Sequence, residues 1–295
     1  MELIFLAELA VNGALTGLLY SLFAIGLVLI YKASSVPNLA QGGLTMLGAY
    51  VVLALARDAG LPLWAAIPLA GVAMFGLGTG IERVALRRLA GRPIVMILMM
   101  TLGIDIFLRG TTLAIWGGTS RSVELGVSYD PLFLGEILIS RIHLVGGAVA
   151  VISFVVFVMF FRTRQGTRLR AIADDYMASW SVGISVEQGV GRSWGLASVV
   201  AVAAGIIWGE IQGVDQSLSL LLLKGLTVAV LGGLDSIFGA VLAGVILGVI
   251  ENVGSAYLDP LVGGGSRDLI VAAVLILTVM LRPHGLFGRQ DIERV

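Results

Sequence analysis

Apolar residues in this chain of 295 residues form long runs separated by short polar gaps. Several runs reach the ~20 residues that an α-helix needs to cross a bilayer, so the pattern predicts membrane-spanning helices. Some runs are short or interrupted, and we expect about eight to nine transmembrane helices, some of them broken. The runs cover residues 5–31, 38–56, 62–81, 93–116, 142–161, 191–209, 218–234, 237–253 and 268–281.

The composition agrees with the pattern, because 58% of the residues are hydrophobic and 13% are charged. A soluble domain carries more charge than this. The sequence therefore predicts an all-α integral membrane protein, with one transmembrane domain over residues 1–295 and membrane lipid around it. The formal net charge of zero disfavours nucleic acid as a partner, and the lack of cysteine excludes disulfides, thiol catalysis and cysteine metal sites.

The polar gaps alternate in arginine content, which predicts the orientation of the helices because basic loops stay in the cytoplasm. The gaps at 82–92 and 162–192 and the tail after 281 are rich in arginine, and the gaps between them are not. The amino terminus is thus expected outside and the carboxyl terminus inside. The arginines concerned are Arg83, Arg87, Arg88, Arg92, Arg162, Arg164, Arg168, Arg170, Arg192, Arg282, Arg289 and Arg294.

One predicted cytoplasmic segment, about 162–190, contains the longest polar stretch, "TRQGTRLRAIADDYMASWSVGIS". Its apolar residues recur at the spacing of one helical face, so it predicts a short amphipathic helix that stops near Gly183. Such a helix either lies in the headgroup layer or docks in a groove of a cytoplasmic partner. The residues of the face are Leu169, Ile172, Ala173, Tyr176 and Trp180.

Two apolar runs are interrupted by helix-breaking residues. In "SSVPNLAQGGLTMLGAY", residues 34–50, Pro37 is followed by Asn38, Gln41 and two glycines, and "LGGLDSIFGA" at 231–240 shows a similar break. Backbone groups freed at membrane depth are satisfied by protein or by a water-filled cavity, so such breaks often line a pathway. The alternative is an ordinary turn at the interface.

Polar side chains inside the predicted spans are candidates for a substrate pathway, since an unpaired ionisable group in hydrocarbon is costly. Asn12, Asp105 and Lys224 are the ones that stand out. Lys224 lies near a helix end and could extend to the interface, and Asp105 could instead pair with Arg109 four residues on. Glu251 closes its predicted span and is expected at the interface.

Pairs of glycines four residues apart occur in two predicted spans, Gly13 with Gly17 and Gly244 with Gly248. This spacing lets two helix backbones approach closely in a membrane. We therefore expect these glycines to serve helix packing.

The sequence offers no evident catalytic or metal site. "GLGTG" at 76–80 lies inside an apolar run and lacks the strand and lysine of a nucleotide-binding loop, and His143 and His284 stand far apart without metal-binding context. We expect that the chain is not an enzyme and binds no cofactor or metal itself. A membrane enzyme would need a cluster of nucleophile, base or metal ligands that is not visible here.

Several segments, in this order and spacing, resemble the LivH-type permease subunits of branched-chain amino-acid ABC importers, and the resemblance covers nearly the whole chain. They are "MLGAY" at 46–50, "ERVALRR" at 82–88, "RLRAIADD" with Gly183-Ile184 within 168–184, "AVLGG" at 229–233 and "RPHGLFGR" at 282–289.

The resemblance implies a permease of a bacterial inner membrane that forms half of a translocation pathway. It implies a LivM-like second permease, two cytoplasmic LivG/LivF-like ATPases that hold ATP and Mg, and a periplasmic substrate-binding protein. It also favours docking of the amphipathic segment, as the coupling helix that seats in an ATPase. The residues this assigns to ATPase coupling are Arg170, Ala171, Ala173, Asp174, Ala178 and Gly183.

The substrate expected from the resemblance is a branched-chain or other apolar amino acid, with Asn12, Asn38, Gln41, Asp105 and Lys224 as pathway candidates. Two departures leave urea, short amides and aromatic or other carboxylic acids open. Gln41 and Gly43 replace a histidine and a glutamate that are common in relatives, and Asp235 and Phe238 replace glycine and proline. A self-sufficient secondary transporter is the alternative of another class.

Overall fold

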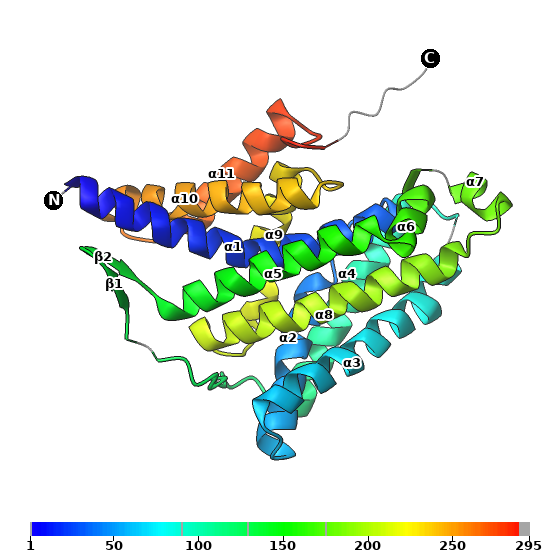
Figure 1. The fold of residues 1–295 in the computed structure, drawn as a ribbon, viewed down its shortest axis with the longest axis horizontal. Coiled ribbons are helices and arrows are strands. Elements are labelled where there is room, and N and C mark those ends of the chain that lie inside the picture. Colours follow the sequence, from blue (N-terminus) through cyan, green and yellow to red (C-terminus); the bar gives the residue numbers. More distant parts are fainter. Residues whose placement is uncertain (1, 90, 129, 175, 289–295) are drawn as a thin grey trace. The chain divides into compact units, whose positions relative to one another are not determined.

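The computed structural model describes residues 2–89, 91–128, 130–174 and 176–288 and shows a helical protein (Figure 1). Besides the helices, the described part contains π-helical turns at Ala54–Asp58 and Glu82–Leu86, a 3-10 turn at Arg87–Leu89, and a hairpin of β1 (Leu132–Leu134) and β2 (Ile137–Ile139). The helices are α1 (Glu2–Ser34), α2 (Gln41–Leu53), α3 (Leu63–Ile81), α4 (Ile94–Trp116), α5 (Arg141–Arg162), α6 (Arg164–Asp174), α7 (Tyr176–Ser181), α8 (Val186–Gln212), α9 (Ser217–Gly232), α10 (Ile237–Val262) and α11 (Ser266–Leu281).

The all-α prediction is confirmed, and each apolar run of the sequence contains one helix. Within the described residues, six helices are long and apolar enough to cross a membrane. The expected count of about eight to nine transmembrane helices, some of them broken, stays a prediction, because α2, α9 and α11 have only 13, 16 and 16 residues. These lengths fall short of the ~20 residues of a full span.

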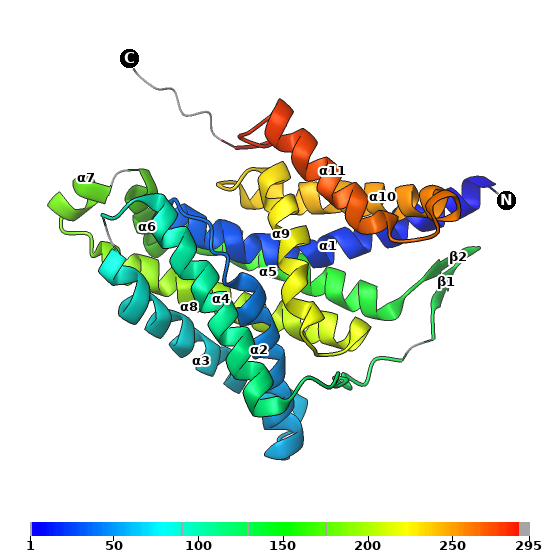
Figure 2. The same cartoon turned by 180° about the vertical axis from the view of Figure 1, so that it is seen from behind.

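The chain divides into two compact units, each built from separate segments. One unit comprises residues 1–25, 127–154 and 223–295, and the other comprises 26–126 and 155–222. Figure 2 shows α2, α4 and α8, which belong to the second unit, from the side opposite to Figure 1. Whether residues 1–295 act as one permease domain stays a prediction.

The paired glycines of α1 and α10 pack against each other, as their spacing predicted. A Cβ atom placed on Gly13 would lie 2.7 Å from the carbonyl oxygen of Gly248, and one on Gly17 would collide with the carbonyl oxygen of Gly244. The two backbones thus approach more closely than any larger residue allows.

We expect Gly13→Val to lower the melting temperature of the purified protein, since overpacking of such a contact costs about 1–3 kcal/mol. Gly110→Val on α4 is the matched control, because a Cβ there would meet no atom within 4 Å. Thermal unfolding in detergent measures both variants. An equal melting temperature for the two would contradict the close approach of α1 and α10.

Asp215, which precedes α9, fixes the start of that helix. Its carboxylate accepts a hydrogen bond from the backbone N–H of Ser217 at 2.8 Å. Burial raises the pKa of Asp215, but hydrogen bonds from Ser217 and Ser120 lower the pKa more, so that it lies below its ordinary value. Asp215 therefore stays ionised at neutral pH and caps the first turn of α9.

Candidate functional site

The break between α1 and α2 is held by two fully buried amide side chains, Asn38 and Gln41. The backbone N–H of Ala40 donates to Oδ1 of Asn38 at 2.9 Å, and Nε2 of Gln41 donates to the carbonyl of Ala197 in α8 at 3.2 Å. The amide of Asn38 also donates to Oε1 of Gln41 at 3.4 Å. Asn38 thus satisfies a backbone group that the interrupted helix leaves open, and Gln41 joins the start of α2 to α8.

Asp105 of α4 lies against the first turn of α2. Its side chain is buried, and Oδ1 accepts the backbone N–H of Gly43 at 2.7 Å. Oδ2 forms an ion pair with Arg109 at 2.7 Å, as the spacing of four residues predicted. A carboxylate at a helix N-terminus is favourable for both hydrogen bonding and the helix dipole. Three of the predicted pathway residues, Asn38, Gln41 and Asp105, therefore gather around the start of α2.

Lys224 of α9 is turned inward, contrary to the expectation that it extends to the interface. Its Nζ lies 2.7 Å from Oε1 of Glu251 in α10 and 3.2 Å from the hydroxyl of Tyr20 in α1. A weaker ion pair joins it to the exposed Asp268 of α11 at 3.5 Å. Glu251 is 3% exposed, so the expectation of an interfacial glutamate is wrong as well. The reason is that α10 continues to Val262, which places Glu251 inside the helix.

Asn12 of α1 has a different environment from Lys224. Its Nδ2 donates to the carbonyl of Leu138 in β2 at 2.8 Å and to the carbonyl of Glu8 at 3.1 Å. Among the described residues, Lys224 contacts neither Leu138 nor Glu8. Asn12 therefore fastens the hairpin to α1, and the structure does not bring the two together.

The second break, between α9 and α10, is covered by the segment that follows α11. The backbone N–H groups of Leu286 and Phe287 donate to the carbonyls of Leu231 at 2.8 Å and Gly232 at 3.1 Å. Phe287 also meets the ring of Phe238 edge to face, with 5.6 Å between ring centroids. The motif at 229–233 therefore contacts the part of the motif at 282–289 that the structure describes, which ends at residue 288. Arg289 lies outside the described residues.

The predicted coupling segment forms two helices, α6 and α7, on either side of Asp175, which lies outside the described residues. Leu169 and Ile172 of α6 are only 3% and 4% exposed, and both reach Gly189 of α8. Trp180 of α7 is 69% exposed. The expected single apolar face is therefore divided between two helices. Its residues on α6 pack against α8 of the same chain.

The outward side of α6 is basic, since Arg164, Arg168 and Arg170 are exposed. Ala171 is half-buried and Ala178 is exposed, and Gly183 has a φ of +79° where the α7 segment ends. Ala173 and Asp174 lie in α6, but their side chains are outside the described part of the chain. Of the two short helices, α6 packs against the first turn of α8.

A charged cluster that the sequence analysis did not single out joins the end of α3 to the beginning of α8. Arg87 forms ion pairs with the buried Glu82 at 3.1 Å and with Glu187 at 2.9 Å. A Cβ on Gly191 would lie 2.9 Å from Oε2 of Glu82, so α8 packs directly on this carboxylate. The sequence motif at 82–88 contains both Glu82 and Arg87, so their pairing could have been predicted. The contact of Arg87 with Glu187 depends on helix packing and could not.

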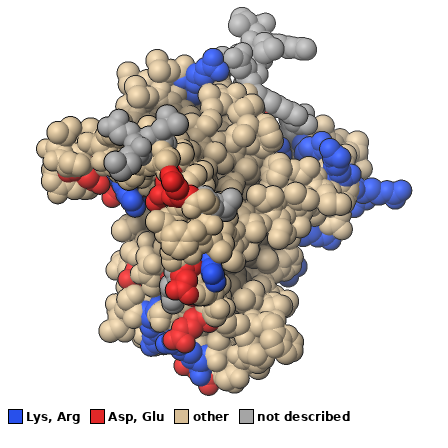
Figure 3. Space-filling view, turned by 60° about the vertical axis from the view of Figure 1, so that its left-hand side comes forward, with Lys and Arg blue, Asp and Glu red and all other residues tan. Residues whose placement is uncertain are grey.

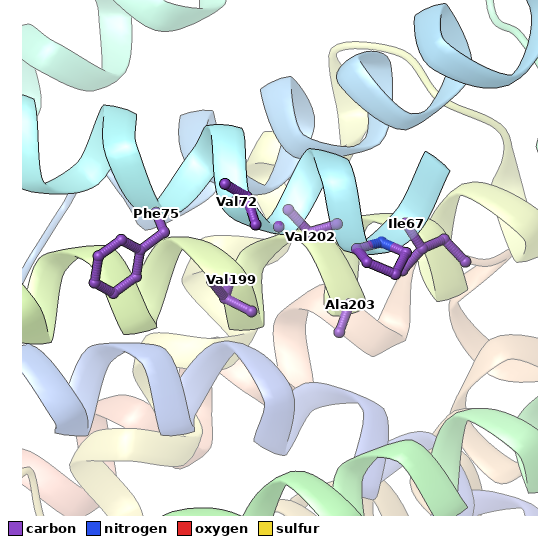
Figure 4. Close-up of a pocket in the computed structure, with 8 residues that line it drawn as sticks. Ile67, Val72, Phe75, Val199, Val202 and Ala203 are labelled. Atoms are coloured by element: carbon purple, nitrogen blue, oxygen red, sulfur yellow. The ribbon is translucent and has the colours of Figure 1, made fainter. Parts of the chain in front are cut away.

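A hollow of about 410 Å³ lies between α3 and α8 (Figure 4). Its lining carries no polar side chain, so it offers nothing to the charged ends of an amino acid. The lining residues are Ile67, Pro68, Gly71, Val72, Phe75, Val199, Val202 and Ala203. On the face shown in Figure 3, uncharged residues predominate and the charged ones form separate patches.

Apolar helices of spanning length, breaks stabilised by buried polar side chains and many exposed large hydrophobic side chains define a multi-pass membrane protein of the transporter kind. The family model described as "Branched-chain amino acid transport system / permease component" matches residues 9–281. The chain belongs to this family, which confirms the resemblance found in the sequence.

Curated relatives agree with the family over nearly the full chain. The high-affinity branched-chain amino acid transport system permease protein LivH of Escherichia coli (strain K12) is 29% identical, covering 96% of each chain. Its counterpart BraD of Pseudomonas aeruginosa is 28% identical, covering 97% of this chain and 96% of the relative. The permease protein LivM of Salmonella typhimurium is 26% identical over 94% of this chain and 69% of its own length.

Proposed function

We propose that this chain is the permease subunit of an ATP-driven importer for branched-chain or other apolar amino acids. The observation that carries the proposal is the family match over residues 9–281. It is joined by relatives that are named as permeases of branched-chain amino acid transport systems and cover 96% and 97% of this chain. These relatives are transport permeases and not enzymes, so the chemistry of ATP belongs to other chains.

The proposed assembly contains a LivM-like second permease that completes the pathway, and the likeness of this chain to LivM supports two related subunits. Two cytoplasmic LivG/LivF-like ATPases would hold ATP and Mg, and a periplasmic protein would deliver the substrate. The assembly would lie in a bacterial inner membrane, with the arginine-rich gaps of this chain in the cytoplasm.

We place the pathway beside the break between α1 and α2. Buried polar side chains gather at this break, and irregular backbone at membrane depth occurs where it is buried in protein or lines a cavity. Asn38, Gln41 and Asp105 hold backbone groups here, so their proposed role is to position the start of α2. Contact with the substrate would come from the backbone that they hold in place.

We assign the coupling of ATP hydrolysis to α6 and α7. Leu169 and Ile172 seat α6 on α8, and the basic outward side together with the exposed Trp180 remains for a partner. A short helix of this kind fits a groove, where apolar anchors give area and charges give orientation. Movement of the partner would then shift α8, because α6 packs on its first turn.

Ala173→Arg is expected to lower ATP-driven uptake at least about tenfold while ATP hydrolysis by the assembled complex continues, because a misdocked interface of this kind costs more than about 1.4 kcal/mol. Uptake and hydrolysis are measured together in proteoliposomes. Ala59→Arg is the matched control, since Ala59 is exposed in the connection between α2 and α3. Unchanged uptake per ATP in the Ala173 variant would remove the coupling role.

A further inference from the structure

We propose that the groove between α3 and α8 binds an anionic phospholipid, with its acyl chain along the apolar half and its phosphate at the basic end. The proposal goes beyond transport. It rests on the proposed function only for the leaflet, which is the cytoplasmic one if the arginine-rich gap at 82–92 faces the cytoplasm.

Two hollows follow one another along the same pair of helices. The apolar hollow lies beside residues 67–75 of α3, and a second, separate hollow of about 440 Å³ lies beside residues 76–87. Between them Phe75 and Thr79 pack on Gly195 of α8, where a Cβ would lie 2.7 Å and 2.9 Å from these side chains. The α8 residues run in the opposite order, so the two helices are antiparallel neighbours (Figures 1 and 4). The second hollow is lined by Gly76, Thr79, Gly80, Glu82, Arg83, Arg87, Glu187, Gln188, Gly191 and Arg192.

Glycines along this groove leave space open instead of serving helix packing. A Cβ on Gly76 or Gly80 would meet no atom within 4 Å, and one on Gly71 would meet only Val199, at 3.9 Å. Gly78, on the packed side of α3, differs because its Cβ would lie 2.6 Å from the carbonyl oxygen of Trp194. The missing side chains therefore form a trough on the exposed side of the helix.

The apolar hollow fits within one leaflet. Over residues 67–75 a helix rises about 12 Å at 1.5 Å per residue. Half of the ~30 Å hydrocarbon core is about 15 Å. An acyl chain that lies along the apolar hollow would thus have its headgroup end at the second hollow, which Arg83 lines.

The basic end of the groove retains positive charge for an anion. Arg87 is engaged by Glu82 and Glu187. Within the described residues, Arg83 and Arg192 have no carboxylate partner, and Arg192 donates only to Oε1 of Gln165, at 3.4 Å. Basic pockets between transmembrane helices on the cytoplasmic side suit phosphate headgroups, and arginine binds phosphate in a bidentate manner.

Native mass spectrometry of the purified complex tests the proposal with two lipids that share palmitoyl and oleoyl chains, phosphatidylglycerol and phosphatidylcholine. Wild-type protein should retain phosphatidylglycerol preferentially. Arg83→Gln with Arg192→Gln should weaken this binding about 25-fold, at about fivefold per arginine, and weaken the binding of phosphatidylcholine less, because its choline offsets the charge of the phosphate. Arg57→Gln with Arg282→Gln is the charge-matched control, because both arginines are exposed and do not line the groove.

A second variant tests the trough without changing charge. Gly76→Leu should weaken the binding of both lipids, whereas Gly103→Leu, at an equally open position on α4, should not. Equal retention of the two lipids by wild-type protein, or unchanged binding in the arginine variant, would overturn the proposal. Binding to the isolated chain but not to the complex would also overturn it, since a partner helix would then cover the groove. Absence of ATPases from the complex would count against the proposed function and leave the lipid result intact.

Discussion

Replacing Lys224 with methionine is expected to destabilise the protein by about 3–5 kcal/mol, the cost of removing one member of a buried ion pair. The 2.7 Å contact between Nζ of Lys224 and Oε1 of Glu251 would be lost. Glu251 is 3% exposed, and its second carboxylate oxygen already has no hydrogen-bond partner in the described part of the chain. The variant would therefore leave a charge buried among apolar helices, which should appear as a strongly lowered melting temperature in detergent.

The double variant Lys224→Met, Glu251→Leu is the control, because apolar residues of similar size can replace a buried pair at little cost. We expect it to recover most of the lost stability. A single variant as stable as the wild type would show that the pair is not buried. Uptake by the stable double variant then decides whether Lys224 also serves the pathway, since loss of uptake without loss of stability indicates contact with the substrate.

Replacing Asp105 with leucine should have a comparable effect, again about 3–5 kcal/mol, because it removes a buried pair and a helix-terminal acceptor together. Arg109 would lose its partner at 2.7 Å, and the N–H of Gly43 would lose its acceptor. The first turn of α2 would then be held less firmly. We expect both a lower melting temperature and reduced uptake.

Asp105→Asn separates the two contributions, since the amide oxygen can still accept the hydrogen bond of Gly43 while the charge is lost. It should be milder than Asp105→Leu in both unfolding and uptake. Equal losses in the two variants would mean that the ion pair alone matters and that the contact with α2 does not.

The sequence predicted the helices well, since long apolar runs must form helices when no water is available for the backbone. It was less able to predict where helices end. The predicted apolar run ended at residue 253, but α10 continues to Val262 and packs on α11, where a Cβ on Gly254 would lie 2.9 Å from Ile270. The environment of Glu251 follows from this packing, which no local pattern contains.

The candidate site was predicted in part. The pair of Asp105 and Arg109 follows from helical spacing, which fixes which side chains meet. The contact of Lys224 with Glu251 joins residues 27 apart in the sequence, and the contact of Arg87 with Glu187 joins residues still further apart. Such contacts depend on helix packing. The packing of the apolar residues of α6 against α8 could not be predicted for the same reason.

Mass spectrometry of the tagged chain, extracted gently from its native membrane, tests the central claim most directly. The account predicts that a second permease and two ATPases copurify with it, and that the reconstituted complex takes up branched-chain amino acids only when ATP is supplied. A chain that purifies alone and moves solute across liposomes without ATP would contradict the account.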